Sequence, residues 1–265
     1  MTPDSSAQRS GAVRLSPITL GTMRLNNAGG AEAAAGILSH AFGIGISSLH
    51  CSAEYETFGL LTEAWRIARA SAPADIAFIA KVASPHFGED RFSAAATRAK
   101  IDSYLMALGL EHLDVVQWLL RHDLKQEQTR IRIMAESAEE VAALAEDLKR
   151  EGKIGMLVSF PYTPAVAAAA LETAGIDGLA LYVNPLEHEM DALLSGAEAA
   201  GKMVIALRPF AAGRTFSETN QSAGDAIAYA LAQPAVVTTV ASASSRAHLD
   251  AFRPWLGEAG FRDRN

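Results

Sequence analysis

The amino-acid sequence predicts an α/β protein, a single-domain (β/α)8 barrel of the TIM type. The chain has 265 residues, of which 49% are hydrophobic and 20% charged, a length and composition typical of one large domain. Short runs of β-branched and apolar residues alternate with longer Ala- and Leu-rich stretches, and about eight such pairs follow one another, the number that a closed barrel needs. A doubly wound open sheet shows the same alternation and is the alternative fold.

Each predicted strand is a short apolar run, as expected of parallel strands that are buried on both faces. Residues 1–11 precede the first run and are rich in Ser, Thr and Gly, so we predict a disordered tail there and a barrel domain over residues 12–265. The predicted strands are residues 16–21, 46–50, 75–81, 113–120, 154–159, 178–184, 202–208 and 235–241.

Helices are predicted between these strands, from apolar residues at helical spacing. Two clear examples are residues 93–108 and residues 137–152. In the second, Ser137 is predicted as the N-cap and Glu140 as its partner in a capping box, and Gly152 is predicted to end the helix.

The composition excludes several classes of protein. A net charge of −7 disfavours binding to nucleic acid or to an anionic membrane surface, since both attract basic patches. No apolar run approaches the ~18–20 residues that span a bilayer, and the N-terminus lacks the apolar core of a signal peptide. Cys51 is the single cysteine, so no intrachain disulfide forms, and we expect a soluble cytoplasmic protein that acts on a small molecule.

Polar residues stand where the predicted strands end, and in a barrel these ends meet at one rim, where the site is built. This arrangement predicts a site at that rim, although loop ends are polar in any barrel. The polar residues in question are His50, Tyr55, Lys81, Arg121, His122, Ser159, Asn184, Arg208 and residues 242–246.

One stretch, G-I-S-S-L-H-C-S-A-E-Y-E, resembles the signature of the aldo-keto reductases, F-D-T-A-x-x-Y-G after a glycine–isoleucine pair. Tyr55 takes the position of the catalytic tyrosine, and Lys81, at the end of A-F-I-A-K, that of the catalytic lysine. His50 stands in place of the catalytic aspartate. The segment L-M-A-L-G-L-E-H-L-D-V-V-Q-W-L is similar to L-x-x-L-G-x-x-x-x-D-L-x-Q-x-H, with Leu119 in place of the catalytic histidine.

The resemblance extends to the cofactor site and implies that NADPH or NADH binds, without a metal ion. L-G-T-M is similar to the turn beside the nicotinamide, and Ser159 to one of the amide contacts, whereas Phe160 and Ala180 replace the asparagine and glutamine that hold the amide. R-P-F-A-A-G resembles the pyrophosphate loop, and A-S-A-S-S-R the adenosine-phosphate segment, with Arg246 as its basic residue. The residues implied in cofactor binding are Gly21, Thr22, Ser159, Arg208, Pro209, Phe210, Gly213, Ser242, Ser244 and Arg246.

The resemblance also implies that Tyr55 donates a proton to a carbonyl oxygen and that Lys81 tunes its pKa, because a nearby ammonium favours the phenolate. We expect His50 to be a neutral imidazole beside that ammonium, either substituting for the aspartate or only hydrogen-bonded to a neighbour. His122 is a second candidate, as a replacement for the missing histidine or as an ordinary loop residue. Cys51 alternates away from His50 and is expected to be a small apolar filler.

Three functions remain open. The first is NAD(P)H-dependent reduction of a carbonyl compound, with Tyr55, Lys81 and His50 as a rebuilt site. The second is non-redox chemistry, as in a lyase, isomerase or cyclase, in which the same residues transfer protons. The third is a non-catalytic binding or partner subunit, because the aspartate and the histidine are missing. The E-H-E tripeptide at residues 187–189 is expected to be an exposed helix start and not a metal site.

Overall fold

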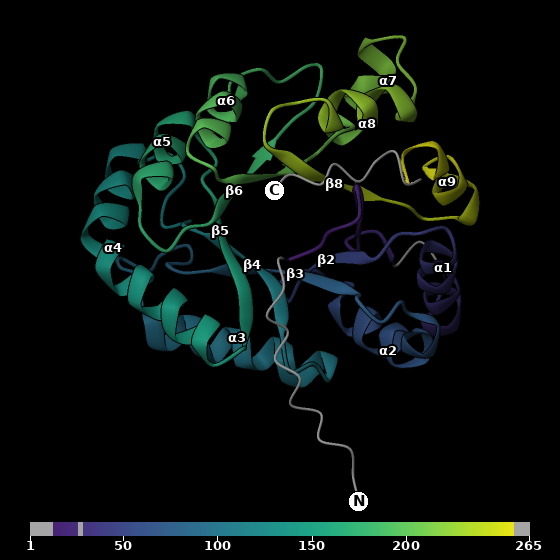
Figure 1. Ribbon diagram of the computed structural model, residues 1–265, viewed down its shortest axis with the longest axis horizontal. Helices are drawn as coiled ribbons and strands as arrows, with labels where there is room; N and C mark the ends of the chain where they lie inside the picture. Colours follow the sequence, from purple (N-terminus) through teal and green to yellow (C-terminus); the bar gives the residue numbers. More distant parts are fainter. Residues whose placement is uncertain (1–12, 26–28, 257–265) are drawn as a thin grey trace, which may run out of the picture.

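The structure, a computed structural model, describes residues 13–25 and 29–256 (Figure 1). The disordered tail predicted for residues 1–11 lies outside the described residues. Within the described part of the chain, no helix is long and apolar enough to cross a membrane.

Eight parallel strands form a closed barrel, which confirms the predicted fold (Figure 1). Neighbours in sequence are neighbours in space, and β8 pairs with β1 to close the sheet. The strands are β1 (Ile18–Gly21), β2 (Ser48–Ser52), β3 (Ala77–Ala83), β4 (Leu113–Leu119), β5 (Ile154–Phe160), β6 (Gly178–Tyr182), β7 (Met203–Leu207) and β8 (Val236–Ser242).

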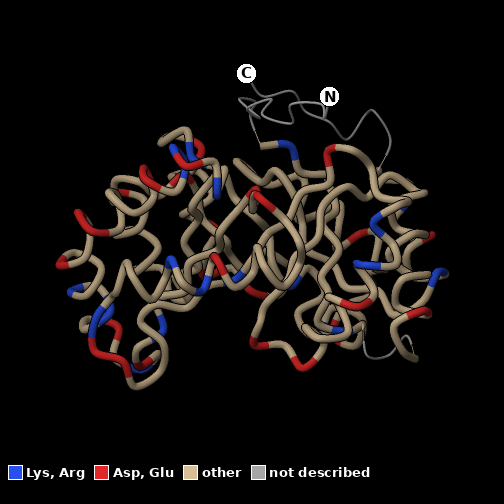
Figure 2. The backbone as a smooth tube through the Cα atoms, turned by 90° about the horizontal axis from the view of Figure 1, so that it is seen from below, with Lys and Arg blue, Asp and Glu red and all other residues tan. Residues whose placement is uncertain are grey.

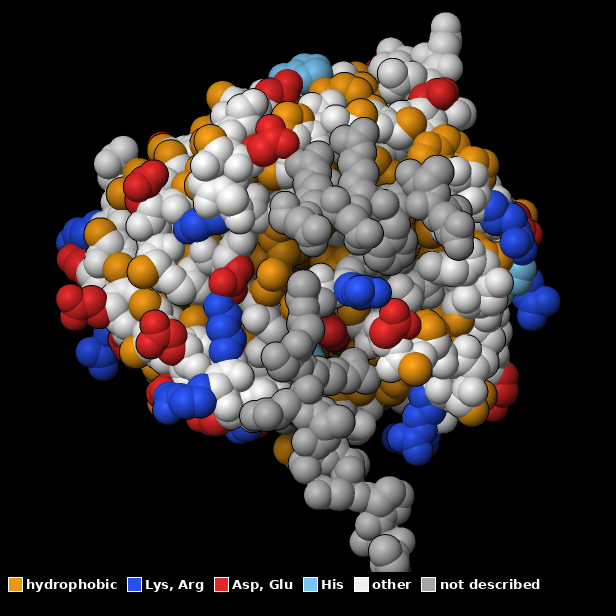
Figure 3. All heavy atoms as spheres, viewed as in Figure 1, with side chains coloured by type: hydrophobic (Ala, Val, Ile, Leu, Met, Phe, Trp, Pro, Cys, Tyr) orange, Lys and Arg blue, Asp and Glu red, His pale blue; other side chains and the backbone are white. Residues whose placement is uncertain are grey.

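Helices surround the barrel on its outside, as Figure 1 shows. They are α1 (Ala31–Gly43), α2 (Phe58–Ala68), α3 (Ala94–Leu108), α4 (Glu127–Arg150), α5 (Pro164–Glu172), α6 (Asp191–Ala199), α7 (Arg214–Glu218), α8 (Ala223–Leu231) and α9 (Arg246–Asp250). The described residues also form short 3-10 segments, namely η2 (Arg69–Ser71), η3 (Ala211–Gly213) and η4 (Arg253–Trp255). Acidic and basic residues are interspersed along the helices (Figure 2) and on the face seen in Figure 3.

The predicted start of the fourth helix is wrong. α4 begins ten residues earlier, at Glu127, and Ser137 lies buried within it. The buried stripe of α4 already includes Ile133 and Met134, so the same packing face continues upstream of the predicted cap. Glu140 instead accepts a hydrogen bond from the backbone N–H of Ala94, 2.8 Å away, at the start of α3.

The helix end predicted at Gly152 is confirmed, and a second glycine, Gly109, ends α3 in the same way. α4 ends at Arg150, and Gly152 follows with a φ of +72° that favours glycine. α3 begins after Ser93, whose hydroxyl accepts a hydrogen bond from the N–H of Ala96, and it ends before Gly109 in the left-handed conformation.

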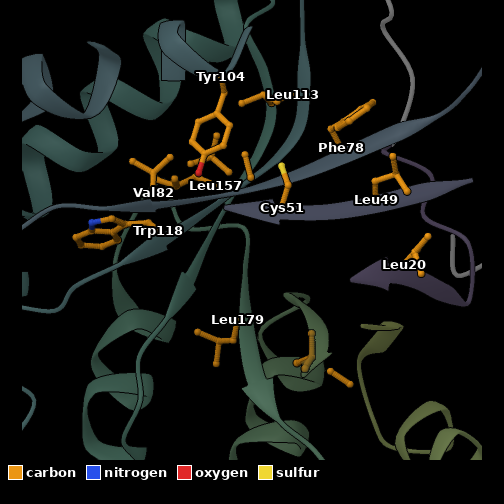
Figure 4. Close-up of a cluster of buried hydrophobic side chains, with 14 of the residues drawn as sticks. Leu20, Leu49, Cys51, Phe78, Val82, Tyr104, Leu113, Trp118, Leu157 and Leu179 are labelled. Atoms are coloured by element: carbon orange, nitrogen blue, oxygen red, sulfur yellow. The ribbon is translucent and has the colours of Figure 1, made fainter. Parts of the chain in front are cut away.

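Side chains alternate along each strand between an outer layer and an inner layer. The outer layer packs against the helices and includes Leu49, Phe78 and Trp118, together with Cys51, the small apolar filler that the sequence predicts (Figure 4). The inner layer fills the barrel, with Val115 among its members. A residue's place in this alternation decides whether it reaches the barrel interior.

β2 and β3 each end two residues later than predicted. His50 is therefore not at a strand end but in the middle of β2, and Lys81 lies two residues before the end of β3. His50 therefore lies deeper in the barrel than predicted. Its side chain is only 4% exposed, below the rim where the sequence analysis expected it.

Candidate active site

Tyr55 and Lys81 come from different segments and meet at the barrel mouth. Tyr55 lies in the turn after β2, where its N–H bonds the carbonyl of Ser52, and Lys81 projects from β3. Lys81 Nζ donates a hydrogen bond to Tyr55 Oη at 3.3 Å. The same ammonium lies 5.2 Å from the centre of the Tyr55 ring and 5.8 Å from that of Phe160. A phenol and an amine in contact form a proton-transfer pair.

The surroundings shift both groups toward their neutral forms. Burial, and next the positive charge of Arg121, lower the pKa of Lys81 to about 8, while the Glu54 carboxylate opposes the shift. Burial raises the pKa of the Tyr55 phenol above its ordinary value. No carboxylate oxygen of the described residues lies within 4.0 Å of Lys81 Nζ. Lys81 therefore lacks the partner that a strand-borne aspartate would provide.

The described residues show no hydrogen bond from His50 to either member of this pair. His50 Nε2 lies 2.9 Å from Gln117 Oε1 on β4, so the ring carries its proton on Nε2 and donates to the amide oxygen. Burial, and next the charge of Lys81, lower the pKa of His50 to about 3, although the bond to Gln117 opposes this. The imidazole is thus neutral, in agreement with the expectation from the sequence. The His50–Gln117 hydrogen bond therefore links β2 to β4 inside the barrel.

A carboxylate does reach the mouth, from a residue that sequence reasoning missed. Glu54 forms an ion pair with Arg121 and lies 3.2 Å from His86 Nε2. Arg121 in turn donates from Nε to Tyr162 Oη at 3.0 Å. The loops after β2, β3, β4 and β5 each contribute one member, so no local pattern reveals the group; its one sequence signal is that Glu54 directly precedes Tyr55.

Apolar and aromatic side chains from β4, β5 and β6 lie beside this ion pair at the mouth. Leu119 is fully buried in the inner layer. Phe160 packs on Tyr162 and Tyr182, with ring centres 4.2 Å and 5.4 Å apart. Arg208 lies over the Tyr182 ring at 4.6 Å. This wall offers stacking surfaces and few hydrogen-bond donors.

His122 does not join the Tyr55–Lys81 pair. It lies in the loop after β4 with a φ of +41°, and its Nδ1 is 2.9 Å from the backbone carbonyl of Glu89. The structure therefore favours the loop interpretation over a replacement for the missing histidine.

The residues implied in holding a nicotinamide are divided between two faces of the sheet. Gly21 faces Ser242 across the β1–β8 pair, where a Cβ on Gly21 would lie 2.7 Å from Ser242 Oγ. Ser159 pairs laterally with Trp118 and Leu179, both in the outer layer, so its side chain faces the helices. Its hydroxyl is buried and has no hydrogen-bond partner among the described residues.

Thr22, directly after β1, is hydrogen-bonded both to β2 and to the turn that follows β2. Its hydroxyl and its backbone N–H both donate to the carbonyl of His50, each at 3.1 Å. Its own carbonyl accepts from the Thr57 hydroxyl at 3.0 Å. Thr22 therefore fixes the turn that follows β1 against the turn that carries Tyr55.

The pyrophosphate loop has an unusual backbone. Arg208 has a φ of +55°, and Gly213 a φ of +96°. Pro209 is buried, and Phe210 packs on Phe216 and Phe252 with ring centres 5.4 Å and 6.5 Å apart. These aromatic contacts hold the loop close to the C-terminal segment that contains α9.

The segment after β8 carries an exposed cation. Arg246 begins α9 and forms no ion pair with any residue that the structure describes. Ser244 Oγ lies 3.3 Å from His248 Nδ1, and Ser245 caps the helix by accepting from the N–H of His248. The Arg246 guanidinium and the hydroxyl of Ser244 are available to an anion from solvent.

The E-H-E tripeptide is not a uniform exposed helix start. His188 and Glu189 are exposed just before α6, as expected, but Glu187 is half-buried and pairs with Arg208 at 3.3 Å. Asn184 donates to the Glu187 carboxylate at 2.8 Å. Among the described residues, no group of three or more His, Cys, Asp or Glu side chains is arranged to hold a metal ion.

Comparison with known proteins decides the family. The sequence model of the aldo/keto reductase family matches residues 17–225. The chain belongs to the aldo/keto reductase family. A search of curated proteins found no match.

Solved structures of aldo-keto reductases share the fold. The holo form of an aldo-keto reductase from Bacillus halodurans aligns with a TM-score of 0.74 at 20% identity, covering 91% of this chain and 86% of that one. A structure from Klebsiella pneumoniae in complex with NADP and acetate aligns with a TM-score of 0.67 at 18% identity, covering 91% and 85%. The glycerol dehydrogenase of Gluconobacter oxydans has a TM-score of 0.70 at 19% identity, covering 92% and 87%. At these identities the likeness establishes the fold alone.

The residues of this aldo/keto reductase fit the phosphate end of a nicotinamide dinucleotide better than its amide end. At the phosphate end, Arg246 is an unpaired exposed cation among the described residues, and serine hydroxyls lie beside it. At the amide end, Phe160 and Ala180 are apolar, and Ser159 faces the other way. A nicotinamide dinucleotide would therefore be held here mainly through its phosphates.

Proposed function

We propose that this protein is an NAD(P)H-dependent carbonyl oxidoreductase in which Tyr55 is the proton donor. The observation that carries the proposal is the 3.3 Å hydrogen bond between Lys81 Nζ and Tyr55 Oη at the mouth of an aldo/keto reductase barrel. The mouth also has an aromatic wall, from Phe160 and Tyr162, against which a small organic substrate packs.

A bound nicotinamide supplies the hydride for carbonyl reduction. Tyr55 gives its phenolic proton to the carbonyl oxygen as that oxygen becomes an alkoxide, and the Lys81 ammonium then returns a proton to the phenolate. Burial makes Tyr55 a weak acid on its own, so the adjacent ammonium is needed when the phenolate forms. The lowered pKa of Lys81 makes its ammonium a readier proton source than an ordinary lysine.

The rate of carbonyl reduction is expected to fall as the pH rises through about 8, the pKa of Lys81. The active form carries the Lys81 proton, so activity is full below this pKa and lost above it. Plots of kcat against pH, for a carbonyl substrate at saturating NADPH, measure the position of the fall.

A variant at His50 checks the assignment of this pKa. In His50→Asp, a carboxylate beside Lys81 raises the pKa of the ammonium, and the fall in kcat moves to higher pH. His50→Asn is the matched control, because it places no charge there and keeps a hydrogen-bonding side chain next to Gln117. A flat profile in the native protein, or equal profiles for the two variants, would contradict the role given to Lys81.

Replacing Arg246 by Ala is expected to weaken NADPH binding about 10- to 100-fold, the range for losing a charged hydrogen bond to phosphate. NADH lacks the 2′-phosphate, so its Kd should change much less. Arg253→Ala is the control, since that nearby arginine is already paired with Asp250 at 2.9 Å. Calorimetric titration with both cofactors measures the change; equal losses for NADPH and NADH would show that Arg246 does not select the phosphate.

Titration of the purified protein with NADPH and NADH, followed by nicotinamide fluorescence and by heat, tests the function itself. Saturable binding supports the proposal and justifies a screen of aldehydes and ketones. If neither cofactor binds, with or without a carbonyl compound present, the proposal fails.

A second candidate function is non-redox proton transfer, as in a lyase, isomerase or cyclase. The apolar Phe160 and Ala180 at the amide end favour it, because they give the nicotinamide amide no hydrogen bonds. Turnover that persists without nicotinamide and is lost in Tyr55→Phe would establish this candidate in place of the reductase.

A further inference from the structure

The amine of Lys81 differs from those of the other partly buried lysines. Lys149 and Lys153 each pair with an aspartate at 2.7 Å. Lys100 and Lys202 each donate to a backbone carbonyl at 2.6 Å. Lys81 has one long hydrogen bond, to the Tyr55 hydroxyl, and no carboxylate or carbonyl partner among the described residues. Its lone pair is therefore available once the ammonium loses its proton.

We propose that Lys81 is also a covalent site for carbonyl compounds, forming a reversible imine with aldehydes and reactive ketones. This activity uses no nicotinamide and goes beyond the reduction proposed above. It requires only the amine, a nearby acid and a cavity that admits the carbonyl compound.

The chemistry balances without an oxidant or a reductant. The Lys81 nitrogen attacks the carbonyl carbon and forms a C–N bond, while the electron pair of the C=O double bond moves to oxygen, which takes the Tyr55 proton. The nitrogen returns one of its own protons to the phenolate, and the second passes, through Tyr55, to the departing hydroxyl. Amine and carbonyl compound thus become imine and water, and reversal by water restores both.

Three features of the site favour this reaction. The lowered pKa of Lys81 leaves more free amine at neutral pH than an ordinary lysine has. The Tyr55 hydroxyl is in place to protonate the oxygen that must leave. When the imine is protonated, its cation lies near the Phe160 ring, where the ammonium is now 5.8 Å from the ring centre, and aromatic faces attract cations.

A cavity adjoins this lysine, between the ends of β2 and β3 and helix α3. It has a volume of about 370 Å³ and is lined by residues that include Lys81, Glu54, His86 and Tyr104. Cavities of ~150 Å³ bind benzene in other proteins, so a small aromatic aldehyde fits this space. Benzaldehyde is the suitable probe because it is a small aldehyde and the cavity is lined in part by the aromatic ring of Tyr104.

The test is reductive trapping of the full-length protein with benzaldehyde and cyanoborohydride at pH 7, in the absence of nicotinamide, followed by peptide mapping by mass spectrometry. Lys81 is expected to gain a benzyl group about 10- to 100-fold faster than an exposed lysine, because its free-amine fraction is larger. Lys202 is the internal reference: burial also lowers its pKa, but its amine donates to two backbone carbonyls. Labelling of Lys81 no faster than Lys202 or the exposed lysines would overturn the proposal.

Variants of Lys81, Lys202 and Tyr55 test the assignment of the labelling further. Lys81→Met should abolish the fast labelling, whereas Lys202→Met should keep it. Tyr55→Phe retains the amine and should slow the labelling several-fold; an unchanged rate would refute the proton donation by Tyr55. The comparison of Lys81 with Lys202 within the native chain needs no variant, so it holds even if Lys81→Met folds poorly. Because no nicotinamide is present, failure of this proposal is distinct from failure of the reductase proposal.

Discussion

Replacing Tyr55 by Phe is expected to lower kcat for carbonyl reduction by about 10²- to 10⁴-fold, the usual contribution of a positioned acid. The variant removes only the hydroxyl that Lys81 contacts at 3.3 Å and keeps the ring. Cofactor affinity should be retained, since Arg246, the proposed phosphate contact, belongs to another segment. Steady-state kinetics with one aldehyde substrate, together with a cofactor titration, measure both quantities.

Tyr182→Phe is the matched control for this experiment. Tyr182 lies at the same mouth, and its hydroxyl makes no hydrogen bond with the described residues, so kcat should stay within about five-fold, as for most substitutions away from a reacting group. Equal activities of the two variants would remove Tyr55 from the proposed chemistry. An unchanged kcat in Tyr55→Phe with strong activity of the native protein would point to another acid.

Arg130→Ala is expected to destabilise the protein by about 3–5 kcal/mol, as for breaking a buried charged hydrogen-bond network. Arg130 is fully buried, and its guanidinium donates to the backbone carbonyls of Leu120 and Pro161. It also lies 5.3 Å from the Tyr162 ring centre. Alanine leaves both carbonyls without their donor and opens a cavity, so urea unfolding monitored by circular dichroism should show a large drop in midpoint.

Arg132→Ala is the control for the same helix. Arg132 is 67% exposed and reaches Glu136 only at 4.0 Å, so its loss should change stability by no more than about 0.5 kcal/mol. Similar unfolding midpoints for the two variants would mean that Arg130 contributes no more than a surface arginine.

The position of Arg130 connects stability to the site. The carbonyls it holds directly precede Arg121 and Tyr162, two members of the ion-pair group at the mouth. The segments that directly follow β4 and β5, and that carry Arg121 and Tyr162, are therefore held in place by a buried charge on α4. Nothing in the local sequence marks Arg130 as buried, because an arginine in a helix is ordinarily exposed.

The fold was predictable because its signals are local. Each strand is a short apolar run, and each helix has its own periodicity, so barrel closure follows from the number and order of elements. The wrong helix start predicted at Ser137 also came from a local signal. A serine followed three residues later by glutamate satisfies a local rule, but burial of Ile133 and Met134 against the barrel extends α4 past it.

The order of the sequence segments and their motifs were enough to predict the barrel and the family, and they indicated Tyr55 and Lys81 as candidates for proton transfer. The outward orientation of Ser159 became clear only from the fold, because Ser159 shares the parity of Leu157, which packs in the outer layer. Only the tertiary structure decided which groups surround the pair. The partnership of His50 with Gln117, and that of Glu54 with Arg121, joins segments 67 residues apart in each case. Such contacts depend on how barrel closure orients the loops, and no short-range sequence pattern predicts that orientation.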